Sequence, residues 1–112
     1  METSRLQSPE FGVSSRVDGD AAVVELVGEL DEWTRPRVDE EIHVLGRAGV
    51  TQFTVDATGL TFVGVSGVHA LVALLADHPA SLVAVVGASA SFAKLLEVSG
   101  VGAHLADVQL RA

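Results

Sequence analysis

The 112-residue sequence contains no cysteine, and Lys and Arg together number only 7 against 15 Asp and Glu. Without cysteine the chain forms no disulfide, carries no thiolate nucleophile and builds none of the common cysteine zinc sites. The formal net charge of -8 disfavours nucleic acids and anionic membranes as partners, because proteins hold both chiefly through Lys and Arg. The composition therefore favours a protein partner with a basic or neutral surface.

Long apolar runs are also missing. Residues 1–12 lack the apolar core of a signal peptide, and no apolar run approaches the ~20 residues of a membrane-spanning helix. We therefore expect a cytoplasmic protein without membrane insertion. Residues 1–9 are interpreted as a flexible N-terminal tail and residues 10–112 as one domain, since a chain of this length has room for one hydrophobic core.

Apolar residues make up 48% of the sequence but aromatic residues only 4%, which predicts an aliphatic core. Phe11, Val13 and Val17 lie at even spacing before Asp-Gly-Asp at 18–20, the pattern of a strand that enters a tight turn. Residues 21–30 are almost continuously apolar. They predict a second strand, covered on both faces.

The next segment predicts a helix. Thr34 is expected to cap it and Pro36 to lie in its first turn, with apolar residues at helical spacing until Gly46 or Gly49 ends it. Its opposite face is rich in charged residues and should be solvated.

Strands and helices alternate through the rest of the chain. The predicted elements are a short strand from Phe53 to Asp56, a loop from Thr58-Gly59 past Phe62 to Gly64, a helix at about 66–78, a strand at 82–86, a helix capped by Ser89 or Ser91 and ending before Gly100, and an edge strand at 105–110. Short strand-helix-strand links favour parallel pairing with right-handed crossovers. The predicted fold class is α/β, with a mixed, mostly parallel β-sheet of about five strands and helices mainly on one side.

Three local segments carry a family resemblance. Residues 27–31 read Val-Gly-Glu-Leu-Asp and are followed by Thr-Arg-Pro at 34–36; Val-Asp at 55–56 precedes Gly-Leu-Thr-Phe at 59–62 and Gly-Val-Ser-Gly-Val at 64–68; and residues 92–101 read Phe-Ala-Lys-Leu-Leu-Glu-Val-Ser-Gly-Val. In this order and spacing they resemble the STAS domain of bacterial anti-sigma factor antagonists, over about residues 11–110.

The resemblance implies a protein that binds an anti-sigma factor, which can be a serine kinase, and so regulates sigma-factor-dependent transcription. In the family, phosphorylation of a Ser at the start of the second helix abolishes this binding. Alignment of Gly67 and Val68 with the family's Gly-Leu puts Gly64 at the family's Asp and Val65 at the phosphoacceptor Ser. Valine cannot accept phosphate, so the phosphorylation switch is degenerate at this position.

Three interpretations of this departure stay open. The protein can be an antagonist that phosphorylation does not turn off, it can be switched at another residue, or it can use the same fold for a different partner. The candidate phosphorylation sites are Ser66 and Thr61, although a Ser at a helix start commonly serves as its N-cap and a loop Thr commonly bonds nearby backbone.

The resemblance also implies a partner-binding surface around the second-helix start. Its candidate residues are Glu29, Asp31, Trp33, Gly64, Val65, Ser66 and His69. For Glu29 and Asp31 the alternative is a carboxylate that serves only the turn. Trp33 either anchors a partner or covers the end of the sheet. His69 either lines the same surface or is a solvated helix residue.

Catalytic, metal and cofactor sites are not expected. The four His residues lie on separate predicted elements, with no pair spaced to bind one metal from a single helical turn. Gly-Val-Ser-Gly-Val at 64–68 lacks the second Gly of a nucleophile elbow, because Val68 stands there. A non-enzymatic binding protein is therefore the leading hypothesis. The alternative is a ligand-sensing or transport-associated STAS interaction module, and the sequence leaves a homodimer open.

Overall fold

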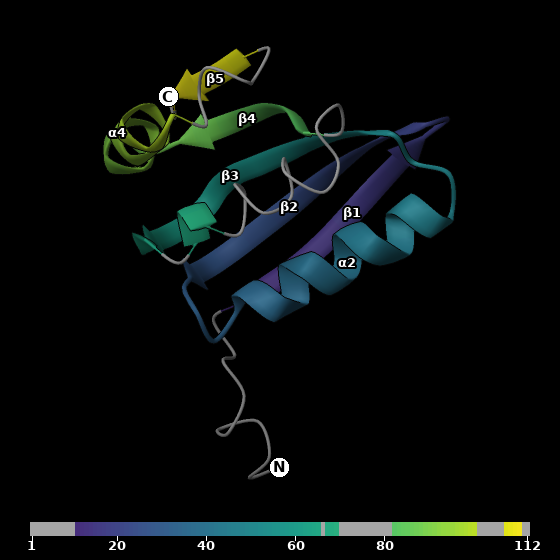
Figure 1. Ribbon diagram of the computed structural model, residues 1–112, viewed down its shortest axis with the longest axis horizontal. Helices are drawn as coiled ribbons and strands as arrows, with labels where there is room; N and C mark the ends of the chain where they lie inside the picture. Colours follow the sequence, from purple (N-terminus) through teal and green to yellow (C-terminus); the bar gives the residue numbers. More distant parts are fainter. Residues whose placement is uncertain (1–10, 66, 70–81, 101–106, 111–112) are drawn as a thin grey trace, which may run out of the picture.

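The computed structural model describes residues 11–65, 67–69, 82–100 and 107–110, and they form a five-stranded sheet with the strand order β1-β2-β3-β4-β5 (Figure 1). The strands are β1 (Gly12–Asp18), β2 (Ala21–Leu30), β3 (Gln52–Val63), β4 (Leu82–Ala88) and β5 (Asp107–Leu110). β1 is antiparallel to β2, and the other neighbours are parallel. The predicted mixed, mostly parallel sheet is confirmed.

The hairpin between β1 and β2 forms as the sequence predicts. Asp18 pairs with Ala21, and the intervening turn includes Gly19, whose φ of 65° is readily adopted by glycine. Phe11, just before β1, is buried, and the Arg37 guanidinium lies 5.2 Å from the centre of its ring while donating a hydrogen bond to its backbone carbonyl. These contacts tie the start of the hairpin to the helix that follows it.

Only one face of β2 is fully covered, so the expectation of a strand buried on both faces is wrong. Val24 and Leu26 are buried in the core, whereas Val27 on the opposite face is 52% exposed. The strand order explains the difference. Successive parallel strands added in one direction by right-handed crossovers place the connecting helices on the same side of the sheet.

β3 is longer than the sequence predicts, and the expected loop after Asp56 is wrong. β3 runs on to Val63, with a register shift in which Asp56 pairs with Glu25 and Gly59 pairs with Val27. The shift is an irregularity of the β-bulge type, which interrupts the alternation of apolar and polar residues by which a strand is recognised in a sequence. A Cβ on Gly59 would lie 2.9 Å from Val27 Cγ2, so glycine permits the close approach of the two strands. The extended β3 delivers the chain directly to Gly64.

The two fully described helices cover the sheet with amphipathic faces. α2 (Arg35–Arg47) buries Val38, Ile42 and Leu45, and α4 (Ala90–Ser99) buries Phe92 and Leu96 in the same core. α2 lies over β1 and β2, while α4 lies beside β4 and β5 (Figure 1).

The structure shows which of the predicted residues begin and end these helices. Ser89 rather than Ser91 caps α4, since its hydroxyl accepts a hydrogen bond from the Phe92 N–H at 3.1 Å, and Gly100 ends the helix with a φ of 85°. α2 ends at Arg47, two residues before Gly49, whose φ is 104°.

The second predicted helix begins within the described residues. The backbone is helical at Val65 and at 67–69, which confirms a helix start at the predicted place within one residue. Its predicted continuation to His78, and the predicted beginning of the last strand at Leu105, lie outside the described residues.

Candidate partner-binding site

The first part of the site is the turn formed by residues 31–34 between β2 and α2, here called the Asp31 turn. The Asp31 carboxylate oxygen Oδ1 accepts hydrogen bonds from the N–H groups of Trp33 at 2.9 Å and Thr34 at 3.1 Å. Thr34 is only 4% exposed, and its hydroxyl donates to the Glu29 carbonyl at 2.7 Å and accepts from the Asp31 N–H at 3.0 Å. The side chains of Asp31 and Thr34 therefore satisfy backbone groups of the turn and of the end of β2.

This arrangement corrects the predicted role of Thr34. Thr34 does occupy the N-cap position of α2, with Pro36 in the first turn, but its side chain makes no capping hydrogen bond to the helix. Its hydroxyl instead bonds back to the end of β2, and the N–H groups of the turn are satisfied by Asp31. Asp31 therefore has a structural task in the turn, and its predicted contact with a partner stays a prediction.

The second part of the site follows β3, is here called the Gly64 turn and consists of the described residues Gly64, Val65, Gly67 and Val68. The Gly64 N–H donates to the Leu30 carbonyl at 3.0 Å, and the Gly64 carbonyl accepts from the N–H groups of Gly67 at 3.0 Å and Val68 at 3.3 Å. A Cβ on Gly67 would lie 2.8 Å from Leu30 Cγ and 3.1 Å from the Leu30 carbonyl oxygen. Leu30 thus joins the two turns, since its carbonyl holds one and Asp31 follows it in the other.

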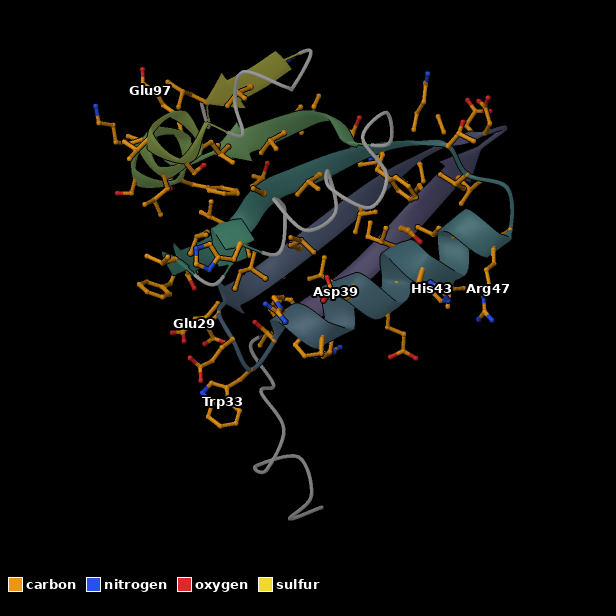
Figure 2. The ribbon with its side chains drawn as sticks, viewed as in Figure 1. Glu29, Trp33, Asp39, His43, Arg47 and Glu97 are labelled. Atoms are coloured by element: carbon orange, nitrogen blue, oxygen red, sulfur yellow. The ribbon has the colours of Figure 1, made fainter. Side chains whose placement is uncertain are left out.

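Large apolar side chains project from this junction. Trp33 is 81% exposed, Val65 is 61% exposed and Phe62 is 54% exposed. Figure 2 shows Glu29 and Trp33 together at the end of β2, with Trp33 pointing away from the body of the molecule. The alternative in which Trp33 covers the end of the sheet is therefore wrong.

The other predicted site residues are placed less completely. Glu29 is exposed and pairs across the strands with Phe62, and His69 and Thr61 are exposed. Ser66 lies outside the described residues, so its role as a cap or phosphoacceptor stays a prediction. Phe62 was not among the predicted site residues, because the residue fell in an expected loop. The only signal for it was a large aromatic side chain two residues before Gly64.

Asp56 is a second carboxylate that bonds a backbone group two residues ahead. Its Oδ1 accepts from the Thr58 N–H at 3.0 Å. Hydrogen bonds from the Thr58 side chain and backbone, aided by the Arg16 charge and opposed by partial burial, hold the pKa of Asp56 below its ordinary value of 3.8. Asp56 pairs with Glu25 on the face of the sheet opposite the core, so it lies apart from the two turns.

The part of the chain that the structure describes holds no group of three or more His, Asp or Glu side chains arranged to bind a metal ion. Within the same residues, no helix has the length and apolar character to cross a membrane. The arrangement that the structure does show is an exposed apolar surface beside carboxylates, at the edge where the parallel strands β2 and β3 end.

Comparison with known proteins identifies the family. The family model described as "Mlab, STAS domain" matches residues 13–110, and the chain therefore belongs to the STAS domain family. No curated protein sequence matches the chain.

Solved structures confirm the fold. The chain is similar to the anti-sigma factor antagonist SpoIIAA in its unphosphorylated form, with a TM-score of 0.70 and 23% identity over 87% of this chain and 86% of that one. It is also similar to an anti-sigma factor antagonist from Mycobacterium paratuberculosis, with a TM-score of 0.76 and 17% identity over 90% and 88%. The phosphorylated form of Bacillus SpoIIAA gives a TM-score of 0.66 and 23% identity over 87% and 89%.

Proposed function

We propose that the protein is an anti-sigma factor antagonist-like protein, which binds an anti-sigma factor and so regulates sigma-factor-dependent transcription. The binding surface consists of the Asp31 turn and the Gly64 turn. Membership of the STAS family and a fold shared with anti-sigma factor antagonists support this function. The net charge of -8 is compatible with a partner that presents a basic surface.

The observation that carries the proposal is the exposure of Val65. Its side chain lies at the start of a helix, at the position that aligns with the family's phosphoacceptor Ser, and is mostly exposed. An exposed valine there adds nothing to the core, and helix starts favour residues that bond the free N–H groups. Trp33 and Phe62 are likewise exposed large apolar residues next to the two turns, and exposed apolar side chains of this kind often mark a protein contact.

Of the three interpretations that the sequence left open, the proposal takes the first, an antagonist that phosphorylation does not turn off, because the exposed apolar side chain of Val65 suits a contact better than a switch. A side chain without a hydroxyl cannot take the phosphate that would place about two negative charges at the contact. The protein is therefore an antagonist whose binding is not turned off by phosphorylation at residue 65.

The proposal is tested by mixing the purified protein with each anti-sigma factor of the source organism, with and without ATP. Complex formation is read by size-exclusion chromatography and phosphate by intact mass. One anti-sigma factor is expected to form a complex that persists with ATP while residue 65 carries no phosphate. Failure of all of them would overturn the proposal and favour a STAS module with a different partner.

Three variants sharpen this test. Val65→Ser restores a hydroxyl at the position of the family's acceptor, so with a kinase partner and ATP it is expected to gain one phosphate and leave the complex. Val44→Ala is the matched control, because Val44 is also an exposed valine but lies on α2 outside the two turns. A Val44→Ala protein that loses the complex as fully as a charged Val65→Asp protein would contradict the assigned surface.

A further inference from the structure

A small cavity lies between the end of β3 and the start of α4. Its volume is about 270 Å³, and it is lined by residues 60–63 of β3 together with Ser89, Ser91 and Phe92. Leu60 and Phe92 are buried members of the core, whereas Thr61, Phe62 and Ser91 are exposed. The cavity therefore joins an apolar interior to a partly polar mouth.

The lining restricts the chemistry of an occupant. Among the described residues no charged side chain lines the cavity, so none of them would neutralise a phosphate or a carboxylate there. The Ser89 hydroxyl is engaged by the Phe92 N–H, and within the described residues no hydrogen bond uses the hydroxyls of Thr61 and Ser91. Two hydroxyls beside an apolar interior suit a group that is aromatic but carries one polar atom.

The size of the cavity restricts the occupant further. Sites for drug-sized ligands and cofactors have volumes of roughly 300–1,000 Å³, so a cavity slightly below this range has room for a single large side chain. Tryptophan and tyrosine combine a large apolar ring with an N–H or O–H that seeks a partner, and they are the commonest anchors of protein interfaces together with arginine.

The cavity is next to the Gly64 turn along the chain, and Phe62 of its lining is one of the exposed apolar residues near that turn. Val63 of its lining is followed directly by Gly64 of the Gly64 turn, and Phe62 pairs across the strands with exposed Glu29. α4 begins just after β4, so the cavity lies at the edge of the sheet where β2, β3 and β4 end. A partner docked on the two turns would reach it without crossing the sheet.

We propose that this cavity is an anchor pocket of the partner interface and takes a Trp or Tyr side chain of the anti-sigma factor. The inference rests on the proposed function, which it extends by giving the interface a third element, the start of α4. Phe62 lines the pocket and is also exposed at the surface. We therefore expect a bound aromatic side chain to contact the Phe62 ring.

The first experiment probes the pocket in the free protein. Indole is titrated into the ¹⁵N-labelled protein and followed by NMR, with Phe62→Ala beside the wild type. Indole is expected to shift the amide signals of the lining residues in the wild type and to shift them much less in Phe62→Ala. Absence of lining shifts in the wild type at millimolar indole would overturn the pocket.

The second experiment measures affinity for the anti-sigma factor that binds the wild type. Phe62→Ala is expected to weaken the complex by about tenfold or more, as removal of an interface anchor contact does. Val98→Ala is the control, because Val98 is an exposed apolar residue of α4 that does not line the cavity, and it is expected to bind within about twofold of the wild type. Urea unfolding of each variant separates lost contact from lost folding.

The outcomes distinguish the two proposals. A wild-type complex that Phe62→Ala does not weaken would overturn the anchor pocket and leave the proposed function standing. No complex with any anti-sigma factor would overturn both. Where the complex forms, Trp→Ala and Tyr→Ala variants of the anti-sigma factor identify the occupant. One of these variants must weaken binding to the wild-type protein but weaken binding to Phe62→Ala much less, because the two residues would be in contact. If none does, the aromatic occupant is wrong.

Discussion

The Asp31 turn and the Gly64 turn meet at Leu30, yet they reverse the chain in different ways. The Asp31 turn is polar and uses side chains, namely the Asp31 carboxylate and the buried Thr34 hydroxyl, to satisfy backbone groups. The Gly64 turn uses backbone hydrogen bonds and the absence of side chains at Gly64 and Gly67. In both, the residues that shape the turn leave a neighbour exposed, Trp33 in one and Val65 in the other.

This difference separates residues that position the surface from residues that contact a partner. Substitution of a positioning residue should lower the free energy of unfolding. Substitution of an exposed neighbour should lower affinity and leave folding unchanged. Single substitutions distinguish positioning residues from contact residues, beginning with the largest expected effect.

Trp33→Ala is expected to weaken the anti-sigma factor complex by about thirtyfold, which corresponds to about 2 kcal/mol at an interface hot spot. Its free energy of unfolding should stay within about 0.5 kcal/mol of the wild type, because most of the Trp33 side chain already lies in solvent. Isothermal titration calorimetry and urea unfolding measure the two quantities. A large loss of stability would make Trp33 a positioning residue instead.

Thr34→Ala is expected to lower the free energy of unfolding by about 1–3 kcal/mol, because the Glu29 carbonyl and the Asp31 N–H lose the hydroxyl that satisfies them in a buried place. Thr34→Ser keeps the hydroxyl and is the matched control, with a much smaller loss. Urea unfolding monitored by circular dichroism compares the two. Equal losses in the two variants would show that the methyl group, not the hydroxyl, holds the turn.

Gly67→Ala is expected to cost roughly 1–3 kcal/mol of strain against Leu30, offset by up to about 1 kcal/mol from the better helix propensity of alanine. Gly46→Ala is the control, because Gly46 is an α2 residue around which a Cβ meets open space, so the same change should stabilise the protein by roughly 0.5–1 kcal/mol. Urea unfolding should therefore move in opposite directions for the two variants. A stabilised Gly67→Ala protein would show that Leu30 yields easily.

The smallest expected effect concerns Asp56, which bonds the Thr58 N–H as Asp31 bonds the Trp33 N–H. Because folding lowers the pKa of Asp56 from 3.8, its contribution to stability is present above that value and is lost as the pH falls through the lower pKa of the folded state. Asp56→Asn should therefore lose less stability than the wild type between neutral pH and about pH 3. The urea midpoints of the wild type and the variant at the two pH values measure this difference in stability. Asp39→Asn is the control, because Asp39 is an exposed carboxylate on α2. Identical pH dependence in Asp56→Asn and the wild type would contradict the lowered pKa.

Sequence patterns predicted best where local chemistry alone decides the structure. The turn at 18–20, the apolar spacing of α2 and the serine-to-glycine limits of α4 each depend on residues within a few positions of one another. β3 was misjudged for the opposite reason. Its register shift brings Gly59 close to Val27 on another strand, which only a residue without a side chain permits, and the alternation that identifies a strand is broken at that point.

The candidate site was predicted in the same uneven way. The family resemblance predicted a site at residues 29–33 and 64–69, and the structure brings these two segments together at Leu30. Phe62 and the cavity beside α4 could not be predicted, because they depend on the true length of β3 and on where β4 delivers the chain. Likewise, which backbone groups the side chains of Asp31 and Thr34 would bond depended on the conformation of the turn.

The sequence by itself determined the order of strands and helices and the acidic character, and it predicts that Val65 stands at the position of the family's phosphoacceptor Ser. These properties follow from residue types and short spacings, which do not change when the chain folds. The tertiary structure alone decided which face of β2 is covered, that Trp33 and Val65 stay exposed while Thr34 is buried, and that two turns well separated in the sequence share Leu30. Exposure and proximity are properties of packing between distant segments, so no local pattern records them.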